Sequence, residues 1–152
     1  GVGIAPVNRM IQMQQPVCLG SDGFFDLPQE AVLAKIMQIT ASGNPSAFSD
    51  KQALVMLYDH NIQLAENIFG CRLGKIAPQY TADLILVAYD PVAPIFPENQ
   101  ISHVLNALTS GTVRTVMVNG FVVMQEGELM GIDEGLLHER AQSSAQDIWS
   151  RF

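Results

Sequence analysis

The chain has 152 residues and a mass of 16.6 kDa, the size of one ordinary domain, and its 15 acidic and 8 basic residues give a net charge of −7. This acidity argues against binding nucleic acid or an anionic membrane surface, and 48% apolar residues exclude a disordered chain. A complete (β/α)8 barrel is excluded because it requires about 250 residues. The longest apolar run, residues 84–89, is too short to span a membrane.

The first half of the chain predicts three helices around one short strand. Helices are expected near residues 5–14, from 28 to about 42 and from 49 to 70, and a buried strand of the parallel-sheet kind is expected over residues 17–19. Ser49 and Gln52 fit a capping box at the start of the third helix, and Gly70 ends it. This order is typical of an α/β layer.

The second half predicts a small β layer followed by a helix. Residues 81–89 form an apolar strand that we expect to be covered on both faces, and residues 102–108 form a short helix. Asn119-Gly120 joins strands at 113–118 and 121–126, because a two-residue Asn-Gly loop favours a tight hairpin. Asp133 caps the last helix.

Composition changes near residues 70–79, which divides the chain into residues 1–70 and 71–152. Cys18 and Cys71 have neither a zinc-ribbon spacing nor the pattern of a disulfide framework. We expect reduced thiols and a cytoplasmic protein, with Cys18 a small buried hydrophobe inside the apolar segment 17–19.

Residues that could carry chemistry are few. His60, His103 and His138 are isolated from one another, each inside a predicted helix, so we expect packed or surface residues rather than metal ligands. Asp22 follows the predicted strand 17–19 and lies between Gly20 and Gly23. That position suits a site at the carboxyl end of a strand. From these residues alone, however, an aspartate that caps the next helix or stabilises a turn is the favoured interpretation.

Residues 16–23 (PVCLGSDG) resemble the segment that closes the catalytic barrel in the amidohydrolase superfamily, specifically its chlorohydrolase and cytosine/guanine-deaminase-like branch. Residues 1–7 resemble the loop after that family's seventh strand. Further matches follow in the family's order and extend the likeness over nearly the whole chain: residues 65–70, 73–78, 82–87 and 113–120. The segments 89–91, 98–99 and 148–152 are most similar to the aminohydrolases called SsnA. Gln15 and Gln79 depart from the family, which usually has glycine at both loop positions.

The resemblance implies an α/β fold in two parts. Residues 1–70 would form the last βα unit of a metal-dependent hydrolase (β/α)8 barrel. Residues 71–152 would form the C-terminal strands of a composite β-sandwich domain with a closing helix. The resemblance also implies that Asp22 is both a metal ligand and a catalytic residue, whose carboxylate takes a proton from the attacking water and returns it to the departing amino group or halide.

One divalent metal, zinc or iron, is implied for the complete enzyme, with a purine, pyrimidine or triazine-like heterocycle as substrate. The family's other ligands are histidines, including an H-x-H pair that does not occur in this sequence. Together with the apolar start at residues 1–4, this leads us to expect the C-terminal portion of a longer hydrolase, inactive and metal-free by itself.

Two functions remain open at this point. In the first, the chain completes an enzyme that hydrolyses a C–N or C–Cl bond, and its partner is the N-terminal part of that enzyme. In the second, it is a non-catalytic interaction module that docks on a partner chain or on a copy of itself as a homo-oligomer, because an unpaired strand edge and an apolar face favour association.

Overall fold

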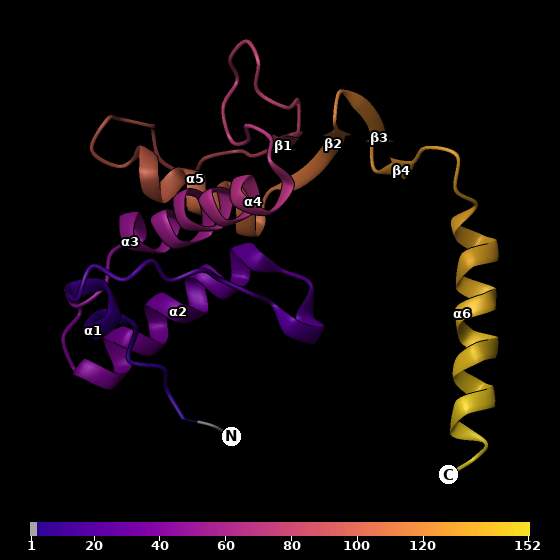
Figure 1. Ribbon diagram of the computed structural model, residues 1–152, viewed down its shortest axis with the longest axis horizontal. Coiled ribbons are helices and arrows are strands. Elements are labelled where there is room, and N and C mark those ends of the chain that lie inside the picture. Colours follow the sequence, from indigo (N-terminus) through magenta and orange to yellow (C-terminus); the bar gives the residue numbers. More distant parts are fainter. Residues whose placement is uncertain (1–2) are drawn as a thin grey trace.

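The computed structural model describes residues 3–152, so part of the loop expected at residues 1–7 lies outside the described residues. A helical body lies beside a small antiparallel sheet, and the last helix stands apart from both (Figure 1). No strand of this sheet pairs in parallel.

The helical body is built from segments that the sequence predicts closely. Its helices are α1 (Val7–Gln12), α2 (Leu27–Ser42), α3 (Asp50–Leu54), α4 (Asn61–Phe69) and, from the second half of the chain, α5 (Gln100–Ser110). The predicted capping box is confirmed: Ser49 accepts from the backbone N–H of Gln52, whose side chain accepts from the backbone N–H of Ser49. Gly70 ends α4 at a φ of 66°, a conformation that glycine adopts without steric cost.

The helix predicted over residues 49–70 contains an irregular turn in its middle. Between α3 and α4, the segment η2 (Val55–His60) is a π-helix, in which each turn holds more residues than an α-helical turn. The π-helix is followed directly by Asn61, the first residue of α4. Such turns are frequent at functional sites, so the residues next to this one are candidates for a specific role.

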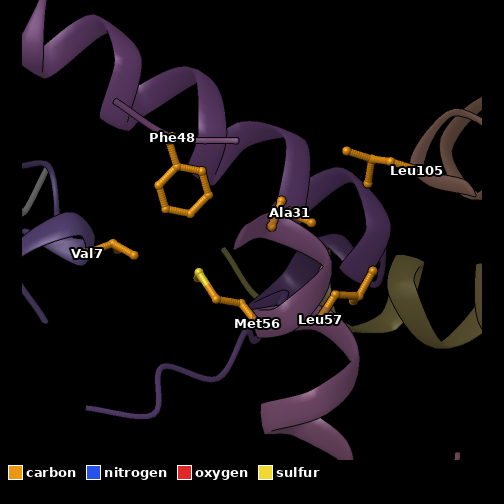
Figure 2. Close-up of a cluster of buried hydrophobic side chains, with 7 residues drawn as sticks. Val7, Ala31, Phe48, Met56, Leu57 and Leu105 are labelled. Atoms are coloured by element: carbon orange, nitrogen blue, oxygen red, sulfur yellow. The ribbon is translucent and has the colours of Figure 1, made fainter. Parts of the chain in front are cut away.

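The hydrophobic core lies entirely in the helical body. Phe48 and Met56 are its largest fully buried side chains, and Figure 2 shows them pointing toward one another from different segments. The other buried apolar residues are Val7, Ala31, Ala53, Leu57 and Leu105. Gln38 is buried among them, and its side chain donates to Ala5 O at 2.8 Å and accepts from Asn8 N at 3.1 Å, so α2 holds the segment that leads into α1.

The sheet has the order β1 (Leu84–Ala88), β2 (Thr112–Val118), β3 (Phe121–Gln125) and β4 (Glu128–Leu129). The Asn-Gly hairpin is confirmed, since Asn119 and Gly120 have φ angles of 49° and 81° between β2 and β3. Asp83 fixes this turn from outside: its carboxylate accepts from Asn119 N at 2.6 Å. Two of the family-like segments, 82–87 and 113–120, thus contact each other.

Three predictions about burial are wrong. Residues 17–19 form no strand; they run extended beside helices, and no β-ladder among residues 3–152 includes them. Cys18 is exposed rather than buried, because side chains alternate along an extended segment and only Val17 and Leu19 turn toward the core. The strand β1 is not covered on both faces, since Ile85 and Leu86 are 49% and 61% exposed.

The last helix, α6 (Glu134–Trp149), begins as predicted, with Asp133 accepting from Leu136 N at 3.0 Å. It does not close the fold: every residue of α6 is exposed, and the helix stands away from the body in Figure 1. The accessible surface of 11330 Å² greatly exceeds the roughly 7,600 Å² expected for a compact monomer of this mass. Within residues 3–152, no helix is both long and apolar enough to cross a membrane.

Candidate active site

The candidate site begins with the extended segment at residues 16–20. On one side of this segment, the side chain of Asn61 contacts both backbone groups of Leu19: Oδ1 accepts from Leu19 N at 2.9 Å, and Nδ2 donates to Leu19 O at 3.1 Å. His60 Nδ1 lies 3.1 Å from Val17 N and 2.9 Å from Val17 O. The side chains of His60, at the end of η2, and of Asn61, at the start of α4, therefore supply hydrogen bonds that a neighbouring strand would otherwise supply.

Asp22 lies just beyond this segment, at the start of the 3-10 helix η1 (Asp22–Phe24). Its φ of 47° is in the left-handed region, which is uncommon for a residue other than glycine. Its side chain is exposed, and among the hydrogen bonds of residues 3–152 none involves its carboxylate. The carboxylate is therefore available to a group from outside the described chain.

The interpretation of Asp22 as a helix cap is wrong. The N-cap of α2 is Asp26, whose Oδ1 accepts from Gln29 N at 3.0 Å. Asp26 was recognisable from the sequence, because an aspartate followed by Leu27-Pro28 is a common start for a helix, with proline in the first turn. The position of Asp22 is thus not explained by capping.

Two hollows border the extended segment. One has a volume of about 330 Å³ and is lined by the backbone segment 17–20 together with residues of α2 such as Leu33 and Met37. The other, of about 480 Å³, lies toward Pro16 and includes His60 and Lys51 in its lining. Asp22 lines neither of these two hollows.

The donor groups needed for a metal centre are not brought together. No group of three His, Cys, Asp or Glu side chains among residues 3–152 could hold a metal ion. His60 contacts Val17, and His103 Nδ1 lies 2.8 Å from Tyr89 Oη, so both have partners within the chain. One exposed carboxylate does not fit zinc, which in proteins takes three or four nitrogen, sulfur or oxygen ligands.

A second polar cluster joins the two halves of the chain. Asp50, at the start of α3, accepts from Lys35 of α2 and from Ser102 of α5. Burial raises the pKa of the Asp50 carboxyl, but hydrogen bonds from Lys35 and Ser102 and the positive charge of Lys35 outweigh it, so the pKa lies below its ordinary value of 3.8. The hydrogen bonds of Asp50 therefore connect α3 to α2 and to α5.

The sequence points to Asp22, but it does not indicate the contacts that His60 and Asn61 make with residues 17–19. Both lie more than 40 positions from the segment they bind. No spacing rule links residues so far apart, and the fold alone brings them together. Their only local signal is the interruption of the helix at η2, which leaves no clear mark in the sequence.

Comparison with known proteins gives consistent likenesses. No family model matches the chain. The chain is 31% identical to a 5-methylthioadenosine/S-adenosylhomocysteine deaminase from Pelotomaculum thermopropionicum, over 98% of this chain and 35% of the relative. It is 28% identical to a 5'-deoxyadenosine deaminase from Methanococcoides burtonii, over 98% of this chain and 35% of that protein. The chain therefore spans about a third of the length of the curated relatives it matches.

The fold is also similar to that of a solved protein. A crystal structure of an adenosine deaminase from Xanthomonas campestris with bound zinc matches with a TM-score of 0.75 and 19% identity, covering 96% of this chain and 34% of that one. At this level of identity the likeness concerns the fold alone. The mixed arrangement of helices and antiparallel strands thus recurs within a deaminase.

Proposed function

We propose that this chain is the C-terminal portion of an amidohydrolase-type deaminase that hydrolyses the exocyclic C–N bond of an adenine nucleoside. The observation that carries the proposal is the likeness to two kinds of adenosine-derivative deaminase along 98% of the chain. The order of the family-like segments, from residues 16–23 to the hairpin at 113–120, is in keeping with it. Deamination is favoured over dechlorination and over an SsnA-type assignment, because these relatives are named as nucleoside deaminases.

In this proposal Asp22 is the catalytic group that the chain contributes. A carboxylate can accept a proton from an attacking water and return it to the departing amino nitrogen as ammonia leaves. The exposure of Asp22 and the lack of a hydrogen-bond partner for its carboxylate among the described residues suit a group that acts on a ligand held elsewhere.

The metal belongs to the longer protein in this proposal. The residues described here do not form a zinc site, so no step is assigned to a metal on this chain. The bound zinc of the Xanthomonas campestris adenosine deaminase supports a divalent metal in the complete enzyme. We accordingly expect the chain by itself to show no deaminase activity and to retain no zinc on dialysis.

The test is a chimera in which this chain replaces the matching last third of the Pelotomaculum thermopropionicum deaminase. With zinc present, we expect it to release ammonia from 5-methylthioadenosine and to change the ultraviolet spectrum as the amino group is lost. Asp22→Asn should lower kcat by about 100- to 10,000-fold, the usual contribution of a positioned acid–base group. Asp147→Asn, on the exposed face of α6, is the matched control and should retain full activity. A folded, zinc-loaded chimera without activity, or an active Asp22→Asn variant, would contradict the proposal.

A second role, as an interaction module, is favoured by the exposed surface. The excess over a compact monomer is about 3,700 Å², within the range buried by permanent protein interfaces. On one side of α6, apolar residues recur at helical spacing: Leu137, Ala141, Ala145 and Ile148. Sedimentation velocity tests this role: the module predicts stable oligomers of the chain alone, whereas a monomer at micromolar concentration would contradict it.

A further inference from the structure

The hydrogen bonds along residues 16–20 fall on alternate residues. In an extended segment, the N–H and C=O groups of every second residue point to the same side. Val17 and Leu19 direct theirs toward His60 and Asn61. By this alternation, the backbone groups of the intervening Cys18 belong on the opposite side. Only the Sγ of Cys18 contacts the helix, at 3.5 Å from His60 O.

Asn61 reproduces the bonding of a peptide group. Its carboxamide carries one acceptor and one donor with the same chemistry as a backbone C=O and N–H. The acceptor and the donor of Asn61 both bind Leu19, at 2.9 and 3.1 Å. The residues on either side of Leu19 cannot make the same pair of hydrogen bonds, because their backbone groups point away from Asn61. A slip by one residue would break both hydrogen bonds at once.

His60 adds a second point of attachment. Its Nδ1 lies within hydrogen-bond distance of both Val17 N and Val17 O, and a ring nitrogen serves one of them at a time. With the proton on Nδ1 the ring donates to Val17 O, and with the proton on Nε2 it accepts from Val17 N. Either tautomer therefore holds Val17 in place.

We propose that Asn61, assisted by His60, is a positioning residue for the segment carrying Asp22. It sets the register of this segment against α4, that is, which residue of the segment lies opposite Asn61. Asp22 follows Leu19 by three residues, so a one-residue slip would displace its carboxylate by about 3.3 Å, the rise per residue of an extended chain. A misplacement of this size is enough to disable a proton-transferring group. The importance of the register for catalysis rests on the proposed function, but the register itself does not.

The register is tested on the 152-residue chain by hydrogen exchange of backbone amides, followed by NMR. We expect the amide of Leu19 to be protected and that of Cys18 to exchange freely. Asn61→Leu should speed exchange at Leu19 at least about tenfold without affecting amides of α2. Asn61→Asp keeps an acceptor for Leu19 N and loses the donor for Leu19 O, so protection should fall only in part. Asn67→Leu, at an exposed position of α4, is the matched control and should change nothing.

The role in positioning is tested in the deaminase chimera. Asn61→Leu should lower kcat about tenfold or more while KM and zinc content stay close to the unsubstituted values, because the proposed role of Asn61 is exerted through Leu19 and the position of Asp22. Asn61→Asp should restore part of kcat. An unprotected Leu19 amide overturns the proposal whatever the activity, and so does an Asn61→Leu chimera with unchanged kcat. An inactive unsubstituted chimera instead overturns the proposed function and leaves the register to be decided by the exchange data.

Discussion

Ser102 donates to Asp50 Oδ2 at 2.6 Å, although the two residues lie 52 positions apart in the chain. This hydrogen bond joins α5, from the second half of the chain, to the start of α3. With Lys35 on the other carboxylate oxygen, it makes Asp50 the polar centre of the contact between three helices.

The Asp50 cluster predicts a dependence of stability on pH. Because the pKa of Asp50 is lowered in the folded chain, its ionised form stabilises the fold above the ordinary pKa of 3.8, and this stabilisation is lost as the pH falls through the lower, folded value. Urea unfolding at a series of pH values should therefore show a loss of stability below about pH 4. The loss should be smaller in Asp50→Asn and unchanged in Asp147→Asn; an identical acid profile for all three proteins would contradict the assignment.

The same cluster predicts the effect of removing its hydroxyl. Ser102→Ala should lower the free energy of unfolding at neutral pH by about 1–2 kcal/mol, the cost of removing a hydrogen bond to a charged group. Urea denaturation measures this change. Ser150→Ala, at the exposed end of α6, removes a hydroxyl of the same kind that bonds only Asp147 O, and it should alter stability by less than about 0.5 kcal/mol. Equal effects of both substitutions would contradict a structural role for Ser102.

The different burial of Phe48 and Phe25 predicts that replacing them has very different effects on the stability of the fold. Phe48 is 2% exposed and packs in the centre of the core, whereas Phe25 is 90% exposed. Phe48→Ala should lower the free energy of unfolding by about 3–5 kcal/mol through the cavity it leaves. Phe25→Ala should change it by less than about 0.5 kcal/mol. Urea midpoints of the two variants check this; a larger loss for Phe25→Ala would show that the core lies elsewhere.

The close packing around Gly111, at the junction of α5 and β2, predicts that a larger residue at this position destabilises the fold. A Cβ atom at this position would overlap Ala107 O and would lie 2.6 Å from Val87 Cγ1, so a methyl group does not fit. Gly111→Ala should cost about 1–3 kcal/mol of stability by overpacking. At Gly20 a Cβ would meet nothing within 4 Å and the backbone φ is not positive, so Gly20→Ala is the matched control. Thermal unfolding should separate the two variants by several degrees, and coincident transitions would rule out the clash.

The isolated position of α6 predicts that it adds nothing to the stability of the body. Deleting residues 134–152 should leave the free energy of unfolding, measured in urea, unchanged to within about 0.5 kcal/mol, since every residue of α6 is exposed. If α6 instead mediates association, the deletion should convert oligomers to monomers in sedimentation without changing the midpoint at low concentration. A clear loss of stability in the monomer would mean that α6 packs on the body in solution.

Elements defined by local chemistry could be predicted from the sequence. The capping box at Ser49, the Asn119-Gly120 turn and the cap at Asp133 each depend on residues within four positions of one another, and all three are confirmed. The helix expected over residues 102–108 is longer than predicted, running from Gln100 to Ser110 between Asn99 and Gly111, residue types that commonly border helices.

Features that depend on distant partners could not be predicted in the same way. The apolar run at Val17 and Leu19 indicates burial but not the identity of its neighbours, and here side chains of η2 and α4 take the place of adjoining strands. For the same reason, Asp22 could be singled out as a candidate, whereas the residues that hold its segment could not. Gln79 adopts a φ of 70° where the resembling family usually has glycine, so the loop keeps a left-handed backbone despite the side chain.

The π-helical turn at η2 makes this part of the chain respond differently to a deletion and to an insertion. Because a π-helical turn holds more residues than an α-helical turn, loss of a single codon within Val55–His60 would let the turn relax to regular α geometry while α4 keeps nearly the same phase, and Asn61 would still face Leu19. An inserted codon would instead rotate all that follows by about 100°, the angle between successive residues of an α-helix, and would swing Asn61 away from Leu19. Natural variants of this segment should accordingly include single-residue deletions more often than insertions.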